Sequence, residues 1–239
     1  AANNDAEIQF ERTTLFEIAD GGSLKLSGLA VSGKSSPDNV GNSVIRTSRY
    51  SMLINYQVEV ENSKFTDLDV NRSFNFLNVA KSTMADSISI VDSQFSNVSG
   101  AILQLDKETD DYGIFNADYV RITGSSFTNV QGALTKLYRG GTDESTFGPH
   151  FFLKDSKLIN VGTGSKNKSK SSIYLHGVQV TELANNSLSE SAAIKIQHTV
   201  GEPATRIVNN RLTGMPLPTV QELHSRKENT AVIEGNSVN

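Results

Sequence analysis

Residues 86–105 read DSISIVDSQFSNVSGAILQL and contain the pattern that decides the fold. Ile88 and Ile90 alternate with polar residues, Phe95 follows the small polar Ser93, and a second short apolar run ends the stretch. Alternation with a period of two is typical of a strand with one buried face, and Ser, Asn and Gly between apolar runs form turns. The stretch therefore predicts short strands separated by tight corners.

The same pattern recurs along the chain at intervals of 30 to 32 residues, and finally of 24. The apolar anchors of the six copies are Phe65, Phe95, Phe127, Leu158, Leu188 and Leu212. Five positions before each anchor stand the aliphatic residues Val60, Ile90, Ile122, Leu153, Leu183 and Ile207. Two positions before each anchor stand Ser63, Ser93, Ser125, Ser156, Asn186 and Asn210. A degenerate repeat of about 20–50 residues indicates a solenoid.

The residue pattern within one repeat indicates which kind of solenoid the chain forms. Its apolar runs are short, alternating and β-branched, whereas helical repeats need amphipathic runs of ten or more residues. We therefore predict an all-β fold, a right-handed parallel β-helix with coils of about thirty residues and inserted loops; the handedness follows from the parallel crossover rule. The alternative is a β-sandwich, which has no reason to repeat residues in register. We expect residues 1–239 to form a single domain of this kind.

Composition excludes several classes of protein. The net charge is −4 and the pI is near 5.6, so no nucleic-acid partner is indicated. The chain lacks cysteine, which excludes disulfides and thiolate metal sites, and no apolar run is long enough to span a membrane. Hydrophobic residues make up 37%, as suits a core that is one side chain deep.

Two loops carry candidate chemistry. Residues 106–113, DKETDDYG, hold four carboxylates that could bind a hard cation, although their spacing does not match a helix-loop-helix calcium loop. Residues 138–150, YRGGTDESTFGPH, supply the candidate substrate-binding residues Tyr138, Arg139 and His150. A guanidinium beside an aromatic ring suits a sugar carboxylate, and the alternative is a pair of Arg139 with Asp143 or Glu144 that only shapes the loop. Sugar contact predicts that Tyr138 and Arg139 stay exposed, whereas contact with another domain predicts an exposed, partly apolar patch around Phe147 and Pro149.

Other segments complete the expectations. The histidines form no metal-type pair, and His176 and His198, beside predicted strands, are expected to make structural hydrogen bonds. A third loop, residues 162–172, carries three lysines. Residues 219–226 suggest a turn of helix, and residues 231–238 suggest one more strand.

The chain resembles the C-terminal half of alginate lyases of polysaccharide lyase family six, the chondroitinase-B-like group. The stretches that carry the resemblance are FERTTLFEIADGGSLKLSGL, GNSVIRTSRYSM, LYRGGTDESTFGPH, LHGVQV and HTVGEP, beginning at residues 10, 41, 137, 175 and 198. Larger members of the group join two right-handed β-helices. The N-terminal one carries the lysine base, the arginine and the calcium ion that neutralises the substrate carboxylate.

The resemblance implies β-elimination, in which a base removes the C5 proton of a uronate while the 4-O-linked sugar leaves. Because those catalytic motifs belong to the other domain, no catalytic residue and no cofactor is assigned to this chain, and calcium is expected in the N-terminal domain. The implied partners are that domain and alginate or a related polyuronate, and the implied location is secreted or periplasmic. The alternatives are a self-sufficient lyase that uses Arg139 with Lys136 or His150, and a non-catalytic polysaccharide-binding solenoid.

Overall fold

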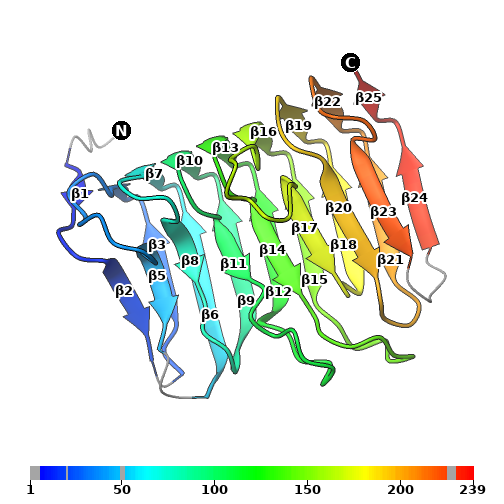
Figure 1. The fold of residues 1–239 in the computed structure, drawn as a ribbon, viewed down its shortest axis with the longest axis horizontal. Coiled ribbons are helices and arrows are strands. Elements are labelled where there is room, and N and C mark those ends of the chain that lie inside the picture. Colours follow the sequence, from blue (N-terminus) through cyan, green and yellow to red (C-terminus); the bar gives the residue numbers. More distant parts are fainter. Residues whose placement is uncertain (1–5, 20, 49–51, 225–229) are drawn as a thin grey trace.

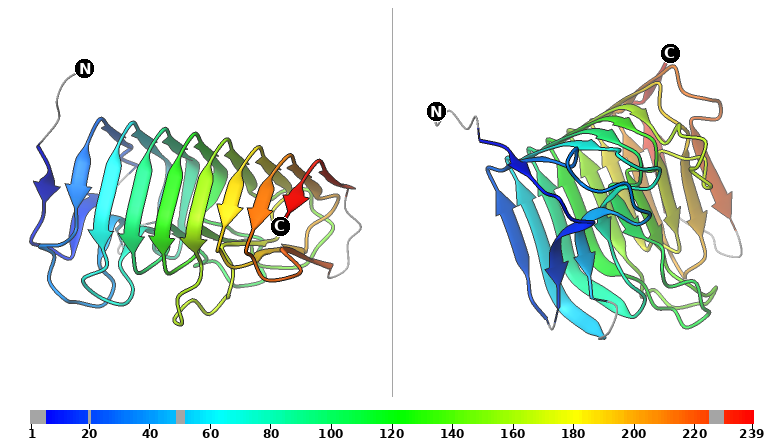
Figure 2. Two further views of the ribbon diagram at one scale, coloured as in Figure 1. Left: turned by 90° about the horizontal axis from the view of Figure 1, so that it is seen from above. Right: turned by 60° about the vertical axis from the view of Figure 1, so that its left-hand side comes forward.

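The computed structural model describes residues 6–19, 21–48, 52–224 and 230–239, and every regular element in these ranges is a β-strand. The strands form three parallel sheets, which we call A, B and C, stacked coil upon coil along one axis (Figures 1 and 2). Each coil contributes one strand to each sheet in the order C, A, B. The fold is the expected parallel β-helix, and its right-handed winding stays a prediction.

Sheet A contains β1 (Ile8–Gln9), β4 (Ala30–Ser32), β7 (Lys64–Leu68), β10 (Gln94–Val98), β13 (Ser126–Val130), β16 (Lys157–Val161), β19 (Ser187–Ser189), β22 (Arg211–Thr213) and β25 (Ser237–Val238). Sheet B contains β2 (Thr14–Ile18), β5 (Ser43–Thr47), β8 (Asn75–Asn78), β11 (Leu103–Leu105), β14 (Thr135–Tyr138), β17 (Ile173–His176), β20 (Ile194–His198) and β23 (Val220–His224). Sheet C contains β3 (Leu24–Ser27), β6 (Leu53–Glu61), β9 (Thr83–Val91), β12 (Ala117–Thr123), β15 (His150–Lys154), β18 (Val180–Ala184), β21 (Ala204–Val208) and β24 (Thr230–Glu234).

The predicted repeat alignment is confirmed by strand register. Ile122 pairs with Ile90 on one side and with Leu153 on the other, and Phe127 lies between Phe95 and Leu158 in the same way. These side chains are fully buried and stack into columns. The rings of Phe95 and Phe127 are stacked with centroids 5.1 Å apart. The interior is therefore a set of like-on-like columns with the strand spacing of a parallel sheet.

A polar column accompanies the apolar ones at the corner between sheets C and A. The backbone N–H of Ser93 donates to the hydroxyl of Ser125 at 3.1 Å, and the N–H of Ser125 donates to the hydroxyl of Ser156 at 3.2 Å. Further along, the N–H of Ser156 donates to the side-chain oxygen of Asn186, whose own N–H donates to that of Asn210. Buried N–H groups at this corner are thus satisfied by the coil above.

One sequence expectation near the C-terminus is wrong. Val220–His224 form strand β23, which pairs in parallel with β20, where a turn of helix was expected. Residues 225 and 226 of that expected helix lie outside the described residues. The pairing places Val220 beside Ile194 and extends sheet B by one strand. The prolines and polar residues of this segment, taken alone, resemble those of a turn. The strands expected within residues 231–238 are present as parts of β24 and β25.

We predict that Ile122→Ala lowers the free energy of unfolding by about 2–5 kcal/mol, because it opens a cavity inside a packed column. Urea unfolding followed by circular dichroism measures the loss. Thr123→Ala is the matched control, since Thr123 is the last residue of β12 and its side chain is exposed. A loss below about 1 kcal/mol for Ile122→Ala would contradict the column.

Candidate functional site

Arg139 does not point into solvent. Its side chain is 2% exposed and is turned into its own loop, residues 139–149, which we call the Arg139 loop. Its Nε donates to the carbonyl oxygen of Phe147 at 2.8 Å, and its Nη1 donates to the carbonyl oxygen of Gly140 at 3.0 Å. Its Nη2 lies 3.0 Å from the carboxylate of Asp143. The expectation that Arg139 remains exposed for sugar contact is wrong, and the alternative of a loop-shaping pair with Asp143 is what the geometry shows.

Three of the five sequence stretches that carry the family resemblance, those beginning at residues 137, 175 and 198, meet at this loop. The N–H of Asp143 donates to the carbonyl of Thr199, and Nε2 of Gln179 donates to the carbonyl of Gly201. Gly177 has a φ of 67°, and a Cβ there would lie 3.0 Å from the carbonyl oxygen of Arg139. In these stretches, small residues therefore let the backbone of the loop approach closely, and buried amides form hydrogen bonds that hold it in place.

The Arg139 loop and the segment of residues 112–114 form an exposed apolar surface, which we call the apolar corner. It consists of Tyr112, Ile114 and Phe147, which are 80%, 45% and 62% exposed. These three residues line one open pocket together with Met84. The sequence-based expectation of an exposed patch at Phe147 is confirmed, whereas Pro149, expected in the same patch, is buried.

His150 lies away from the other two predicted substrate-binding residues. It begins β15 on sheet C, where its ring contacts Tyr119 edge-on with centroids 4.8 Å apart. The guanidinium of Arg121 lies 4.5 Å from the centre of the Tyr119 ring. Burial, and then Arg121, lower the pKa of His150. Tyr138 instead ends β14 on sheet B, so the structure does not bring Tyr138 and His150 into one site.

Tyr138 stacks on His176 of the next coil, with ring centroids 3.9 Å apart and planes 5° from parallel. Nδ1 of His176 lies 3.0 Å from the carbonyl oxygen of Arg139 and must donate to it, because a carbonyl only accepts. Burial lowers the pKa of His176 and raises the pKa of Tyr138. At neutral pH the pair is therefore an uncharged aromatic platform that is held in place by the backbone of Arg139. The expected structural hydrogen bonds of His176 and His198 are both present, the second to Glu222.

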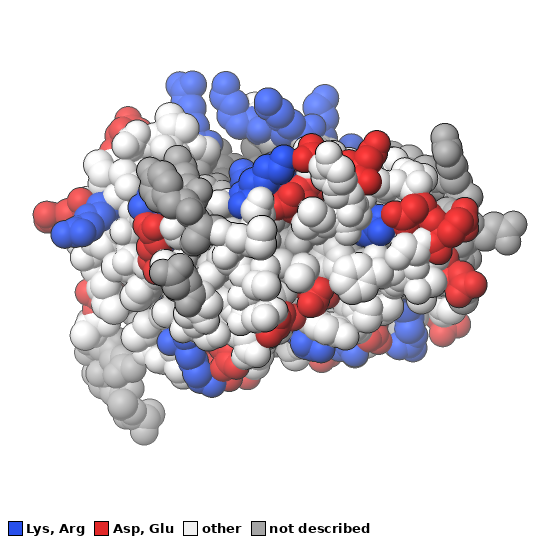
Figure 3. Space-filling model, turned by 90° about the horizontal axis from the view of Figure 1, so that it is seen from below, with Lys and Arg blue, Asp and Glu red and all other residues white. Residues whose placement is uncertain are grey.

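A row of half-buried polar side chains crosses the outer surface of sheet B beside this platform. Strand register aligns Arg46, Asn78, Gln104, Lys136, Tyr174 and Lys195, one from each of six successive coils. We call this row, with Tyr138 and His176, the sheet-B face. Figure 3 shows Lys and Arg side chains gathered along its upper edge, the side on which sheet B lies. In a chain of net charge −4, this face is the place where cations, amides and aromatic rings coincide.

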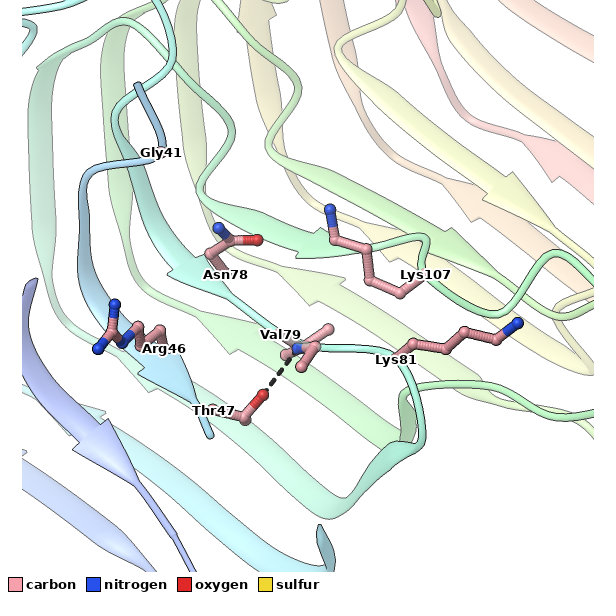
Figure 4. Close-up of a pocket in the computed structure, with 8 residues that line it drawn as sticks. Gly41, Arg46, Thr47, Asn78, Val79, Lys81 and Lys107 are labelled. Carbon is pink, nitrogen blue, oxygen red and sulfur yellow. Dashed lines mark hydrogen bonds between the residues drawn. The ribbon is translucent and has the colours of Figure 1, made fainter. Parts of the chain in front are cut away.

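A pocket of about 360 Å³ opens at one end of the sheet-B face (Figure 4). Arg46, Lys81 and Lys107, from three successive coils, line it together with Asn78. Arg46 is paired with Glu17 at 2.5 Å, and Lys81 with Asp110 at 2.6 Å. Within the described ranges no ion pair involves Lys107, which lines the pocket, or Lys136, which lies in the row, so both are available to an anionic ligand.

The acidic loop does not converge on a metal. Asp106 accepts from the amide of Gln104, Glu108 accepts from the backbone N–H of Ser82, and Asp110 pairs with Lys81. Throughout the part of the chain that the structure describes, no three His, Asp or Glu side chains come together as ligands. Three of the four carboxylates of this loop thus have separate structural partners.

These features define a class: a parallel β-helix with a basic and aromatic sheet surface and a partly apolar loop. Two of the solved structures similar to it support a relationship to the polysaccharide lyases. One is titled "Structure of PL6 family alginate lyase AlyGC", with 41% sequence identity and a TM-score of 0.92, and the alignment covers 98% of this chain and 32% of that one. The other is an arginine-to-alanine mutant of AlyGC, with 43% identity, a TM-score of 0.93 and the same coverage.

The chain thus spans about a third of the length of the lyase that it matches. No family model matches the chain, and no curated protein does. The described residues include no helix that could cross a membrane.

We predict that Arg139→Ala destabilises the protein, because two loop carbonyls and Asp143 lose their donor in a buried setting. The expected loss is about 1–3 kcal/mol, since Asp143 is partly exposed and can recover hydration. Thermal unfolding and limited proteolysis within the Arg139 loop measure it. Lys157→Ala, at an exposed lysine on sheet A, is the control. An unchanged melting temperature with an intact loop would contradict the structural role.

Proposed function

We propose that this chain is the C-terminal β-helix domain of a two-domain alginate lyase, that it is itself non-catalytic, and that it supports the catalytic domain and the substrate cleft. The observation that carries the proposal is the match over 98% of the chain, at 41–43% identity, to a third of a known alginate lyase. A likeness of this extent supports a shared role for the domain and not only a shared fold.

The chemistry of β-elimination supports the non-catalytic part of the proposal. A base removes the C5 proton, the C4–O bond breaks, a C4–C5 double bond forms, and the leaving oxygen takes up a proton. Removal of that proton requires a cation or an arginine against the uronate carboxylate, which stabilises the developing charge. Arg139, the arginine nearest the aromatic platform in sequence, is instead used inside its own loop.

The two surfaces suit different partners. The apolar corner is an exposed apolar area formed by Tyr112 and Ile114 together with Phe147 of the Arg139 loop, and it suits contact with the catalytic domain. The sheet-B face is cationic and aromatic, which suits a polyuronate. A polymeric sugar as the ligand goes with a secreted or periplasmic location, and nucleic acid and membranes are not proposed as partners.

A second candidate, a self-sufficient lyase, has one observation in its favour. Lys136 is the register neighbour of Tyr174 on sheet B, and it lies one coil from the strand that carries His176. Amine, phenol and imidazole are the groups that move protons in such eliminations. Burial raises the pKa of Tyr174 and lowers that of His176, so at neutral pH the phenol is protonated and the imidazole is neutral.

The test is the ultraviolet absorbance of the unsaturated uronate product, measured with the purified 239-residue chain, alginate and added calcium. We expect no product from the chain alone. Steady product formation that is abolished by Lys136→Gln and retained by Lys157→Gln would establish the self-sufficient lyase instead. Addition of a separately produced catalytic domain of the family should raise the activity of that domain. No effect of this addition would favour the third reading, a polysaccharide-binding solenoid that works without a lyase partner.

A further inference from the structure

We propose that the sheet-B face binds an extended polyuronate along the solenoid axis, with about one sugar unit per coil and with Lys136 and Tyr174 as the central binding position. This inference rests on the proposed function and deepens it. It assigns to this domain a substrate-binding track of its own, which adds Tyr174 and the rest of the row to Lys136 and Tyr138.

The spacing of the row supports the track. Parallel strands lie about 4.8 Å apart, so six coils in register place their outward side chains at that interval in a straight line. An extended 1,4-linked uronate chain presents one hexose, and one carboxylate, over a similar length. A polymer whose length per sugar unit is close to the spacing between coils can therefore make the same kind of contact at successive positions.

The row combines charged side chains with neutral side chains that can form hydrogen bonds. Arg46, Lys136 and Lys195 supply cations, and Asn78 and Gln104 supply amides that can reach sugar hydroxyls. These cations are not equally available. Arg46 is shared with Glu17, and Nζ of Lys195 donates to the carbonyl of Ser169, whereas Lys136 has no acidic partner within the described ranges. A uronate carboxylate would therefore form its most favourable ion pair with Lys136.

Aromatic rings flank Lys136. Tyr174 is its register neighbour on β17, and Tyr138 lies two residues further along β14, stacked on His176. Burial raises the pKa values of both tyrosines, so their hydroxyls stay protonated as donors. A ring face and a cation side by side suit the apolar face and the carboxylate of one uronate.

Acidic groups along sheet B oppose binding. Glu17 is the register neighbour of Arg46 at one end of the row and is paired with it. Asp106 lies next to Gln104 on the same side of sheet B, bonded to its amide, and it also contributes to the raised pKa of Tyr174. A polyanion that follows the row has to pass this carboxylate. Removal of the charge of Asp106 should strengthen binding. This variant therefore tests the track with an effect opposite to that of removing Lys136.

Isothermal titration with oligoguluronates and oligomannuronates of two to eight units tests the proposal on the full 239-residue chain. We expect affinity to rise with length up to about six units and then to level off, because six coils contribute to the row. Lys136→Gln and Tyr174→Ala should each weaken binding about tenfold, and Asp106→Asn should strengthen it. Lys157→Gln, an exposed lysine on sheet A, should have no effect.

The outcomes separate the track from the proposed function. Binding that is insensitive to Lys136→Gln and Tyr174→Ala, or that does not depend on length, would overturn the track and leave polyuronate binding by the domain intact. No binding of any oligouronate would overturn both the track and the polyuronate contact of the proposed function. Equal binding of polyglutamate of matched length would also overturn the track, because it would show that charge alone suffices. Circular dichroism of each variant verifies that the fold is retained.

Discussion

The register of the coils depends on a hydrogen bond made at one corner. At the turn from sheet C to sheet A, each coil directs a buried backbone N–H at the side-chain oxygen of the next coil, from Ser63 through Ser93, Ser125 and Ser156 to Asn186 and Asn210. An unsatisfied buried N–H is costly, so a slip of one residue between coils would leave the column without acceptors. The residue before each of these positions adopts a positive φ at Asn62, Asp92, Gly124 and Asp155, which sharpens the corner.

This corner explains why the sequence predicts the core so well. Ile122 and Phe127 occur at constant offsets from Ser125 because the strands of sheets C and A join directly at the corner. The sheet-B face is hidden from the same reasoning, because the chain between sheets A and B varies in length. Lys136 follows its anchor Phe127 by nine residues, whereas Tyr174 follows Leu158 by sixteen, with a loop between them. Their alignment becomes visible only when strand pairing is known.

The Arg139 loop marks the other limit of sequence reasoning. The sequence pattern groups Tyr138, Arg139 and His150 into one candidate sugar site, yet the structure distributes these residues over three environments. Arg139 is buried inside the loop, Tyr138 lies on sheet B, and His150 lies on sheet C. The direction of the guanidinium depends on carbonyl acceptors at Gly140 and Phe147, and their placement is a property of the folded loop that no spacing rule contains.

The register that stacks the core also orders the surface. Once Leu105, Leu137 and Leu175 are stacked inside sheet B, the residues that precede them must form a line outside it, because side chains alternate between the two faces of a strand. Such a line is a common by-product of any β-helix and need not bind anything. What distinguishes the sheet-B face is that the row from Arg46 to Lys195 includes no acidic residue, whereas the corresponding line through Arg121 on sheet C includes Glu59 and Glu182. A linear polyanion would therefore meet carboxylates within the line on sheet C and none within the row on sheet B.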